Sequence, residues 1–467
     1  MNFSEYIYAY GWNRFNMGVI GVWPEPGENI LLRNRAWFYS LLIFILIWIP
    51  QFASVSVFWG NLNETIECLS TNVPVGVSVM KLVVFRYQRK GRNRTLSAIK
   101  INWRSLFEET MMKPTRISRV ISLLSVTVTS GLLVAYTASG VRAFGGGKKD
   151  KATTRNNLLK YFIPTWIGQF AGTWFSMIAY SGPDAFVAML VLHLCGQLAV
   201  VRLNLRNIVD EECLKDPQAF RQKLSDIVKR HEELNRFDYT FSDFNKIRTM
   251  PPQKCYLSFN SMLLAQMLVC TITFCFQGFA MFTVSHSNSQ YPQQIGGEFP
   301  YLGMAFFVLH AIYTISHLFV YCWVGDLLIV EVSHDYEYPN IKKSFLIRLV
   351  AQSSDIGFSP YESNWYLMGP AEIKALMFIT HRSRTPLQIT AGKFCSFSLE
   401  LFTGVRLILL RILILRLDTK KKKFHPQIRA GQIPQVLKAR NEVSSTLSTE
   451  CWIVLENRLG LRDRIEY

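Results

Sequence analysis

The sequence lacks the residue patterns of the common enzyme classes. It holds no G-x-S-x-G, H-E-x-x-H or P-loop pattern, and its glycine runs at 145–147 and 296–297 stand in loops without a strand and a helix around them. Its nine cysteines form no C-x-x-C pair and most lie in or beside apolar stretches, which predicts buried free thiols. We therefore expect no enzyme, no catalytic residue, no metal site and no cofactor.

Acidic residues are also scarce. The chain has 33 Asp and Glu against 51 Lys and Arg, which gives a formal net charge of +18. The basic residues are spread over the segments between apolar stretches and over the C-terminal tail, so we expect no nucleic-acid partner. Charge in this distribution orients membrane spans and contacts anionic lipid head groups, which makes membrane lipids the expected partners.

What the sequence has in abundance is long apolar blocks. Apolar residues make up 49% of the 467, and the block 37–58 carries no charge over more than the roughly 20 residues that cross a bilayer. Residues 1–36 have no apolar signal-peptide core and no cleavage site, so we expect the first span to direct insertion. The expected fold class is an all-α membrane protein, a seven-transmembrane helix bundle with spans at Trp37–Phe58, Ile66–Phe85, Ile117–Gly140, Ile163–Val200, Leu257–Ser285 and Tyr301–Val330 and an atypical candidate around Ile389–Leu417.

The loop charges predict the orientation of this bundle. Loops 60–65 and 286–300 contain no Lys or Arg, whereas 86–116 and 202–254 are rich in both. Because positively charged loops stay in the cytoplasm, the N-terminus is expected inside, although the basic loop 141–160 then lies outside. The expected divisions are a cytoplasmic segment 1–36, six spans with loops 37–330 (cytoplasmic loop 201–256), a cytoplasmic segment 331–388, the candidate seventh helix 389–417 and a basic tail 418–467. The sequon at Asn63 falls in the outer loop, as a glycosylation site requires.

The fourth block contains a charged residue within apolar sequence. Asp184 follows Pro183, and a proline inside a helix removes a hydrogen bond and favours a kink. Because charges inside a membrane are costly, we interpret Pro183 and Asp184 as a gating or pocket element. The alternative is a capping aspartate at a break between two helical pieces.

Histidines and aromatic residues in the blocks have two interpretations each. His310 and His317 lie seven residues apart and share a helix face, but no neighbouring acid or cysteine completes a metal site, so we interpret them as core or pocket residues. Aromatic residues of the third and fourth blocks lie at helical spacing, which indicates packing or a pocket. A pocket lined in this way would select small, volatile or lipid-like ligands by shape and dispersion.

Five stretches carry a resemblance to a known family. They are GWNRFNMGVIGVWPE from residue 11, LNETIECLSTNVPV from 62, DAFVAMLVLHLCGQLAVVRLNL from 184, ESNWY from 362 and ALMFITHRSRTPLQITAGKFCSFSLELFTG from 375. With them the chain resembles the insect odorant receptors, in particular the ligand-tuning subunits. The resemblance implies seven helices, a cytoplasmic N-terminus and a plasma-membrane location in olfactory neuron dendrites. It also implies a heterotetramer with a co-receptor, in which small volatile odorants gate a non-selective cation channel.

The resemblance implies roles for individual residues. Subunits would pack in a cytoplasmic anchor region through Trp365 and Tyr366. The start of the seventh helix would line the pore with Lys393, Phe394, Glu400 and Phe402. The odorant pocket would lie between the second, third, fourth and sixth spans, and side-chain type and depth favour Phe85, Tyr136, Phe170, Trp174, Met177, Tyr180 and Tyr313.

Two stretches depart from the family pattern. Residues 332–352 stand between GDLLIVE and SSDIGFSPYESNWY, which run almost directly into one another in the family. Because Val-Ser can be encoded by a splice donor and Gln by an acceptor, we hypothesise a retained intron. Val405-Arg406 is a second pair that a splice donor can encode, so residues 406–467 would be translated intron. Residues 238–258 are a third, weaker candidate for a retained intron.

The candidate seventh helix carries arginines at 406, 411 and 416. Arginines five residues apart are turned by about 140° on a helix, so these three surround it instead of forming one stripe. A central arginine costs about 2.5–3.5 kcal/mol on insertion, which predicts a failed or shallow seventh span. The alternative is a shifted helix whose arginines reach the membrane edge.

Two functional alternatives stay open beside a receptor. A multipass transporter would show inverted repeats with paired broken helices. The sequence shows one candidate broken helix and no repeat. A misannotated product with a defective pore helix would be non-functional.

Overall fold

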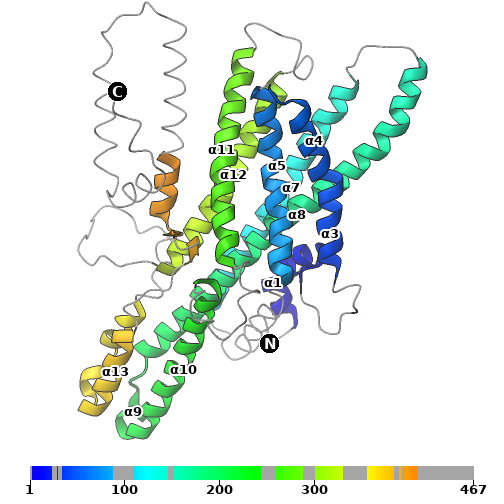
Figure 1. Cartoon of the computed structure of the whole chain (residues 1–467). Coiled ribbons are helices and arrows are strands. Elements are labelled where there is room, and N and C mark those ends of the chain that lie inside the picture. The colour runs from blue at the N-terminus through cyan, green and yellow to red at the C-terminus, as the bar shows by residue number, and fades with distance from the viewer. Residues whose placement is uncertain are drawn as a thin grey trace, which may run out of the picture. The chain divides into compact units, whose positions relative to one another are not determined.

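The computed structural model describes residues 3–23, 29, 34–60, 62–87, 109–145, 152–242, 259–287, 300–329, 355–382, 389–391 and 394–407. The chain divides into two compact units, Met1–Phe402 and Thr403–Tyr467. The helix bundle lies in the first unit (Figure 1). Of the second unit only residues 403–407 are described, and they are helical.

Helices dominate the described part of the chain. The short elements are η1 (Phe44–Trp48), α9 (Glu211–Lys215), η4 (Asp355–Gly357), η5 (Ser359–Glu362), η6 (Trp365–Leu367), β1 (Thr390–Ala391) and β2 (Cys395–Ser396). The longer helices are α1 (Phe3–Val19), α3 (Arg35–Ile43), α4 (Ile49–Val57), α5 (Leu62–Tyr87), α7 (Glu109–Gly145), α8 (Ala152–Arg206), α10 (Pro217–Ser242), α11 (Phe259–Ser287), α12 (Pro300–Ile329) and α13 (Pro370–Arg382).

Six helical stretches among the described residues are long and apolar enough to cross a membrane. Each overlaps one of the first six apolar blocks of the sequence, which agrees with the expected all-α membrane protein. They are Arg35–Val57, Cys68–Tyr87, Pro114–Val134, Ile163–Arg206, Asn260–Ala280 and Phe307–Leu328.

Helix α8 is the centre of the bundle. Its most apolar stretch is 83% buried, against 22–50% for the other five spans, which therefore offer more of their surface to lipid. It packs against α1, α5, α7 and α12 (Figure 1). A stretch of helix that is apolar all round suits such a central position, because each of its faces can pack against protein.

The first span contains a wide helical turn. Helices α3 and α4 are joined by the π-helical segment η1, and the Ile49 amide donates to the carbonyl oxygen of Phe44 five residues earlier. Pro50 follows directly and has no amide hydrogen to continue the regular helical pattern. Single π turns of this kind occur often at functional sites, and this one supplies a wall of the cavity described below.

Helix α8 passes through Pro183 without a break. The alternative interpretation of Asp184 as a cap between two helical pieces is therefore wrong. Neighbouring helices bury α8 at this level, and such surroundings let a membrane helix tolerate the hydrogen bond that a proline removes.

Helices α9, α10 and α13 gather at the Arg206 end of α8 (Figure 1). The segment 201–256, expected as a loop, is largely helical up to Ser242, and α10 packs against α8, α9 and α13. Arg221 Nη2 donates to Glu372 Oε1 at 3.1 Å and joins α10 to α13. Apolar blocks did not mark these helices, because they are amphipathic and charged.

The expected seventh helix starts later than residue 389. Strands β1 and β2 pair antiparallel with Ala391 opposite Cys395, and the Phe397 amide donates to the carbonyl oxygen of Ile389 at 2.8 Å. These bonds hold the segment extended, and helical backbone begins at residue 399. The proposed insertion 332–352, the tail from 408 and most of 238–258 lie outside the described residues.

Candidate ligand pocket and charged cluster

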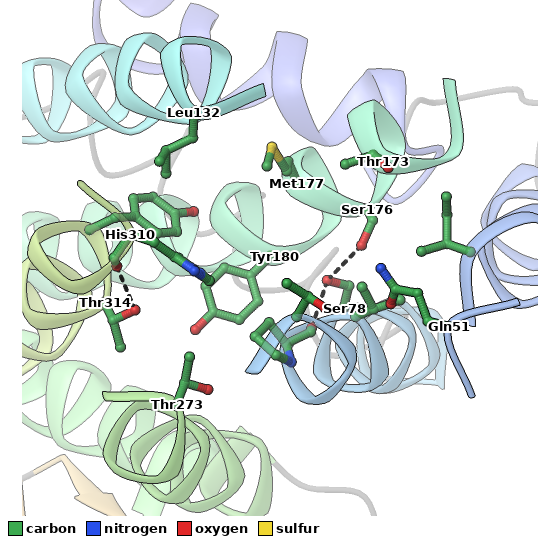
Figure 2. A pocket seen from close by; sticks show the side chains of 15 residues that line it. Gln51, Ser78, Leu132, Thr173, Ser176, Met177, Tyr180, Thr273, His310 and Thr314 are labelled. Atoms are coloured by element: carbon green, nitrogen blue, oxygen red, sulfur yellow. Dashed lines mark hydrogen bonds between the residues drawn. The ribbon is translucent and has the colours of Figure 1, made fainter. Parts of the chain in front are cut away.

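The spans of the first unit line a partly open cavity of about 100 Å³. It lies between the first span, α5, α7, α8, α11 and α12 (Figure 2). Its wall mixes apolar and polar side chains, so that it suits a mainly hydrophobic molecule with a polar group. The apolar and aromatic members are Ile47, Pro74, Val75, Leu132, Met177, Tyr180 and Tyr313, and the polar members are Gln51, Thr71, Ser78, Thr173, Ser176, Thr273, His310 and Thr314.

Tyr180 projects from α8 into the middle of the cavity, as Figure 2 shows. Its hydroxyl accepts a hydrogen bond from Gln266 Nε2 at 2.7 Å, which fixes the ring. The Tyr313 ring lies 6.2 Å away, and Val77 and Leu132 pack in the same buried cluster. Because both tyrosine rings are held by their surroundings, the cavity is largely formed before any ligand arrives.

The cavity wall contains buried polar atoms that have no hydrogen-bond partner among the described residues. Gln51 Oε1 and Thr273 Oγ1 are examples. Other wall hydroxyls are paired: Ser176 Oγ donates to Ser78 Oγ at 3.3 Å, as the dashed line in Figure 2 marks. A buried unpaired polar group costs about 1–3 kcal/mol, so a ligand hydroxyl that reached either atom would gain from removing that cost.

A cluster of charged and polar side chains lies next to Tyr180. Lys81 Nζ donates to Asp184 Oδ1 at 2.5 Å and to the carbonyl oxygen of Tyr180 at 2.7 Å. Asp184 Oδ2 lies 3.0 Å from His317 Nδ1, and the Tyr321 hydroxyl donates to Asp184 Oδ1 at 2.5 Å. Lys81, Asp184, His317 and Tyr321 are called the charged cluster from here on.

The charged cluster is stable inside the bundle only as a unit. Lys81 is 0% and Asp184 5% exposed, and the Lys81 ammonium also lies 4.2 Å from the centre of the Tyr180 ring. A single charge buried in this way would be very costly, whereas an ion pair with further hydrogen bonds is tolerated. The cluster therefore joins α5, α8 and α12 at one point of the membrane interior.

The structure brings three of the expected pocket residues together. Met177, Tyr180 and Tyr313 all line the cavity. The expectation of Phe170 and Trp174 was wrong, because they lie on the outer face of α8, 36% and 40% exposed.

Phe85 is buried but does not line the cavity, because its ring packs on that of Phe186 in the core. The side chain of Tyr136 lies outside the described residues. His310, one of the two histidines interpreted as core or pocket residues, lines the cavity.

The expected pore and anchor residues occupy the last described segments. Glu400 and Phe402 lie on the helix that begins at residue 399, and the Phe402 ring is 5.4 Å from that of Phe319 on α12. Phe394 and Tyr366 are each 65% exposed. Trp365 packs its ring against Tyr366 in η6. Lys393 lies outside the described residues.

The expected glycosylation residue Asn63 lies in the first turn of α5, and its side chain is outside the described part. Whether it carries a glycan stays a prediction.

Sequence reasoning missed several functional candidates. Lys81 stands inside the second apolar block, and the rule that singled out Asp184 applies to it equally. Gln51 and Thr273 gave no such signal, because a neutral polar residue in a span is common. Their position in the wall depends on how the helices pack, which no local pattern encodes.

Comparison with known proteins points to one family. The sequence model of the family described as 7tm Odorant receptor matches residues 61–334 and 347–406, which is more than half of the chain. The match leaves out 335–346, inside the stretch hypothesised as a retained intron.

A curated relative shows a more limited match. Odorant receptor 13a of Drosophila melanogaster is 22% identical over 235 residues, which cover 48% of this chain and 45% of the relative. The chain thus spans less than half the length of the curated relative that it matches.

Two solved structures share the fold. The insect olfactory receptor OR5 from Machilis hrabei has a TM-score of 0.61 alone and 0.63 in complex with eugenol. Each is 13% identical in sequence and covers 89% of this chain and 100% of the other. The likeness confirms the expected all-α, seven-helix membrane fold.

Proposed function

Because the chain belongs to the 7tm odorant receptor family, we propose that it is an odorant-binding subunit of a multi-pass receptor in the plasma membrane. Membership places it among receptors and not among enzymes. Together with a co-receptor subunit it opens a non-selective cation channel, and its site of action is the dendrite of olfactory neurons. The single observation that carries the proposal is the cavity at Tyr180, which lies between the spans and is lined by both apolar and polar side chains.

The cavity supports a compact ligand. Apolar cavities of about 150 Å³ hold a molecule the size of benzene, and this cavity of about 100 Å³ is of that order. Apolar lining supplies burial of the ligand's carbon atoms, at roughly 25 cal/mol for each Å² removed from water. The unpaired atoms of Gln51 and Thr273 favour a ligand that carries a hydroxyl group. A small volatile alcohol or phenol meets both requirements.

The transporter alternative lacks a matching observation. It calls for paired broken helices, whereas α8, the helix expected to be broken, runs continuously through Pro183. A non-functional product, by contrast, is an outcome of the following experiment.

The test is electrical recording from cells that express this chain together with an insect odorant co-receptor. The panel contains eugenol, phenol, hexanol, hexane and heptanone, and cells with the co-receptor alone serve as the control. We expect an inward cation current that depends on the chain and is larger for the hydroxyl compounds than for hexane. Absence of any chain-dependent current, with the protein demonstrated at the cell surface, would contradict the proposal.

A further inference from the structure

One face of α12 runs from the cavity toward the segment that begins the seventh helix. Tyr313, His317, Tyr321 and Gly325 follow one another at four-residue spacing, so they lie along one side of the helix. Twelve residues of helix rise about 18 Å. The side chains of Tyr313, His317 and Tyr321 make contacts that link one end of this line to the other.

The upper end of the line belongs to the cavity. Tyr313 lines it, and its ring lies 4.5 Å from the His317 ring. The Tyr180 ring, which also lines the cavity, lies 5.3 Å from His317. A ligand that displaces either tyrosine therefore presses on a member of the charged cluster, because close-packed rings cannot move independently.

The middle of the line is the charged cluster itself. Asp184 receives bonds from Lys81, His317 and Tyr321 at the same carboxylate, and Lys81 also holds the carbonyl oxygen of Tyr180. Breaking any one of these bonds leaves a buried charge or polar group without its partner. If His317 or Tyr180 moves, Asp184 and Tyr321 must therefore move with it, because one hydrogen bond alone cannot accommodate the displacement.

The lower end of the line touches the segment before residue 399. The Tyr321 ring lies 5.5 Å from the ring of Phe397, which is fully buried. Gly325 is a glycine of necessity, because a Cβ there would stand 2.9 Å from Phe397 Cβ and closer still to the Phe397 carbonyl oxygen. One residue further, Asp326 Oδ1 accepts a bond from the Leu399 amide at 3.2 Å, which fixes the first turn of the next helix to α12.

We propose that the charged cluster is a relay that transmits occupancy of the cavity, through Tyr321 and Phe397, to the start of the seventh helix. The proposal rests on the proposed receptor function and adds how ligand binding reaches the pore segment. Tyr321 is a positioning residue in this relay, since it lines no part of the cavity. Packed side chains and hydrogen-bond networks are the physical carriers of coupling between two sites.

The test compares two tyrosine-to-phenylalanine variants. Tyr321→Phe removes only the hydroxyl that bonds Asp184 and keeps the ring beside Phe397. Tyr10→Phe is the matched control, because it removes a buried hydroxyl that contacts His193, away from the line. Each variant is expressed with the co-receptor, normalised to surface abundance, and measured for maximal current with the panel compound that is most effective on the unmodified chain. Affinity for that compound is measured separately on the purified receptor.

We expect Tyr321→Phe to lower the maximal current at least about fivefold, the lower end of typical coupling between sites, with affinity unchanged within about twofold. Tyr10→Phe should match the unmodified chain in both. Gly325→Ala, which pushes on the backbone of Phe397 and lies outside the cavity wall, should likewise change the current and leave affinity intact.

Other outcomes separate the two proposals. If the unmodified chain gives no odorant current, the proposed function fails and the relay with it. If the unmodified chain responds, and Tyr321→Phe and Gly325→Ala both give the same maximal current as the unmodified chain, only the relay is wrong. Equal losses of affinity and current in Tyr321→Phe would also overturn the relay, because the residue would then act by shaping the cavity.

Discussion

Single polar residues define this site, since they stand inside spans that are otherwise apolar. Thr273 and Gln51 line the cavity, and each carries a buried oxygen without a hydrogen-bond partner among the described residues. Lys81 and Asp184 neutralise each other beside the cavity. In a membrane interior such groups are retained only where a partner or a ligand satisfies them. This difference between unpaired and paired groups separates a recognition role from a structural one, and it can be tested residue by residue.

Thr273→Val removes the unpaired hydroxyl and keeps the shape of the side chain. If a ligand hydroxyl bonds to it, the half-maximal concentration for an alcohol agonist should rise about fivefold, because one hydrogen bond is worth about 1 kcal/mol. Thr271→Val is the control, since Thr271 Oγ1 donates to the Met267 carbonyl oxygen and lies outside the cavity wall. Concentration–response curves check it, and equal curves for the two variants would count against a bonding role for Thr273.

Lys81→Met leaves Asp184 as a buried charge without its ammonium partner. Removing one member of a buried ion pair typically costs about 3–5 kcal/mol, so we expect a large fall in the thermal denaturation midpoint of the purified receptor. Lys81→Met combined with Asp184→Asn removes both charges and should recover much of the loss. A double variant as unstable as the single one would mean that the charges are not paired in the folded protein.

At this scale the sequence predicted part of the site. Asp184 was identified because a charge in an apolar block has a cost, and Tyr180 and Tyr313 because aromatic residues lay at the expected depth. Phe170 and Trp174 satisfied the same spacing argument, yet they face outward, since periodicity shows that residues share a face and not which neighbour that face meets.

Among the elements, the first span shapes the cavity through its wide turn. Ile47 in η1 and Gln51 just after it both line the cavity. Close approach of α8 to this turn depends on Gly172, where a Cβ would stand 2.8 Å from Ile47 Cγ1. The position of Ile47 in the cavity wall therefore depends on Gly172, although Gly172 does not line the cavity.

Gly172→Ala should therefore push Ile47 and alter agonist response. Overpacking of this kind forces side chains to move, and a resulting change of about 1 kcal/mol in ligand binding would alter the half-maximal concentration about fivefold. Gly168→Ala, one turn away on the same helix, is the control because its Cβ would meet Leu46 Cδ2 at an ordinary 3.8 Å. Recording both variants with one agonist checks the prediction, which fails if Gly172→Ala responds like Gly168→Ala.

Element boundaries were predictable where hydrophobicity sets them. The six apolar blocks coincide with six spans because lipid requires apolar residues over a whole span. The β1–β2 hairpin and the helix α10 were not predictable in this way. The first depends on a backbone bond from Phe397 to Ile389, and the second on packing of a charged helix against α8 and α13.

For the whole molecule, loop charge predicts that both ends of the chain lie in the cytoplasm if the seventh span fails. Epitope tags at Met1 and Tyr467 should then stay inaccessible to antibody in intact cells and become accessible after permeabilisation. The physical reason is that the basic loops resist translocation and that the arginines at 406, 411 and 416 disfavour insertion. An exposed N-terminal tag would refute the orientation, and an exposed C-terminal tag would refute the failed span alone.

The retained-intron hypothesis concerns the same C-terminal third. The family match omits 335–346, inside the hypothesised segment 332–352, and it ends at 406. It still covers 332–334 and 347–352, so the retained intron stays a hypothesis. Long-read sequencing of transcripts should recover a form without 332–352. Transcripts that all carry this segment within an uninterrupted exon would refute the hypothesis.

The central claim is that a small hydrophobic molecule acts by occupying the cavity at Tyr180. A cryo-electron microscopy map of the receptor with its most effective panel compound tests this directly. The account predicts added density within the cavity, in contact with Tyr180 and within hydrogen-bond distance of Thr273 Oγ1 or Gln51 Oε1. Density for the compound at another place on the receptor, with this cavity unchanged and empty, would contradict it.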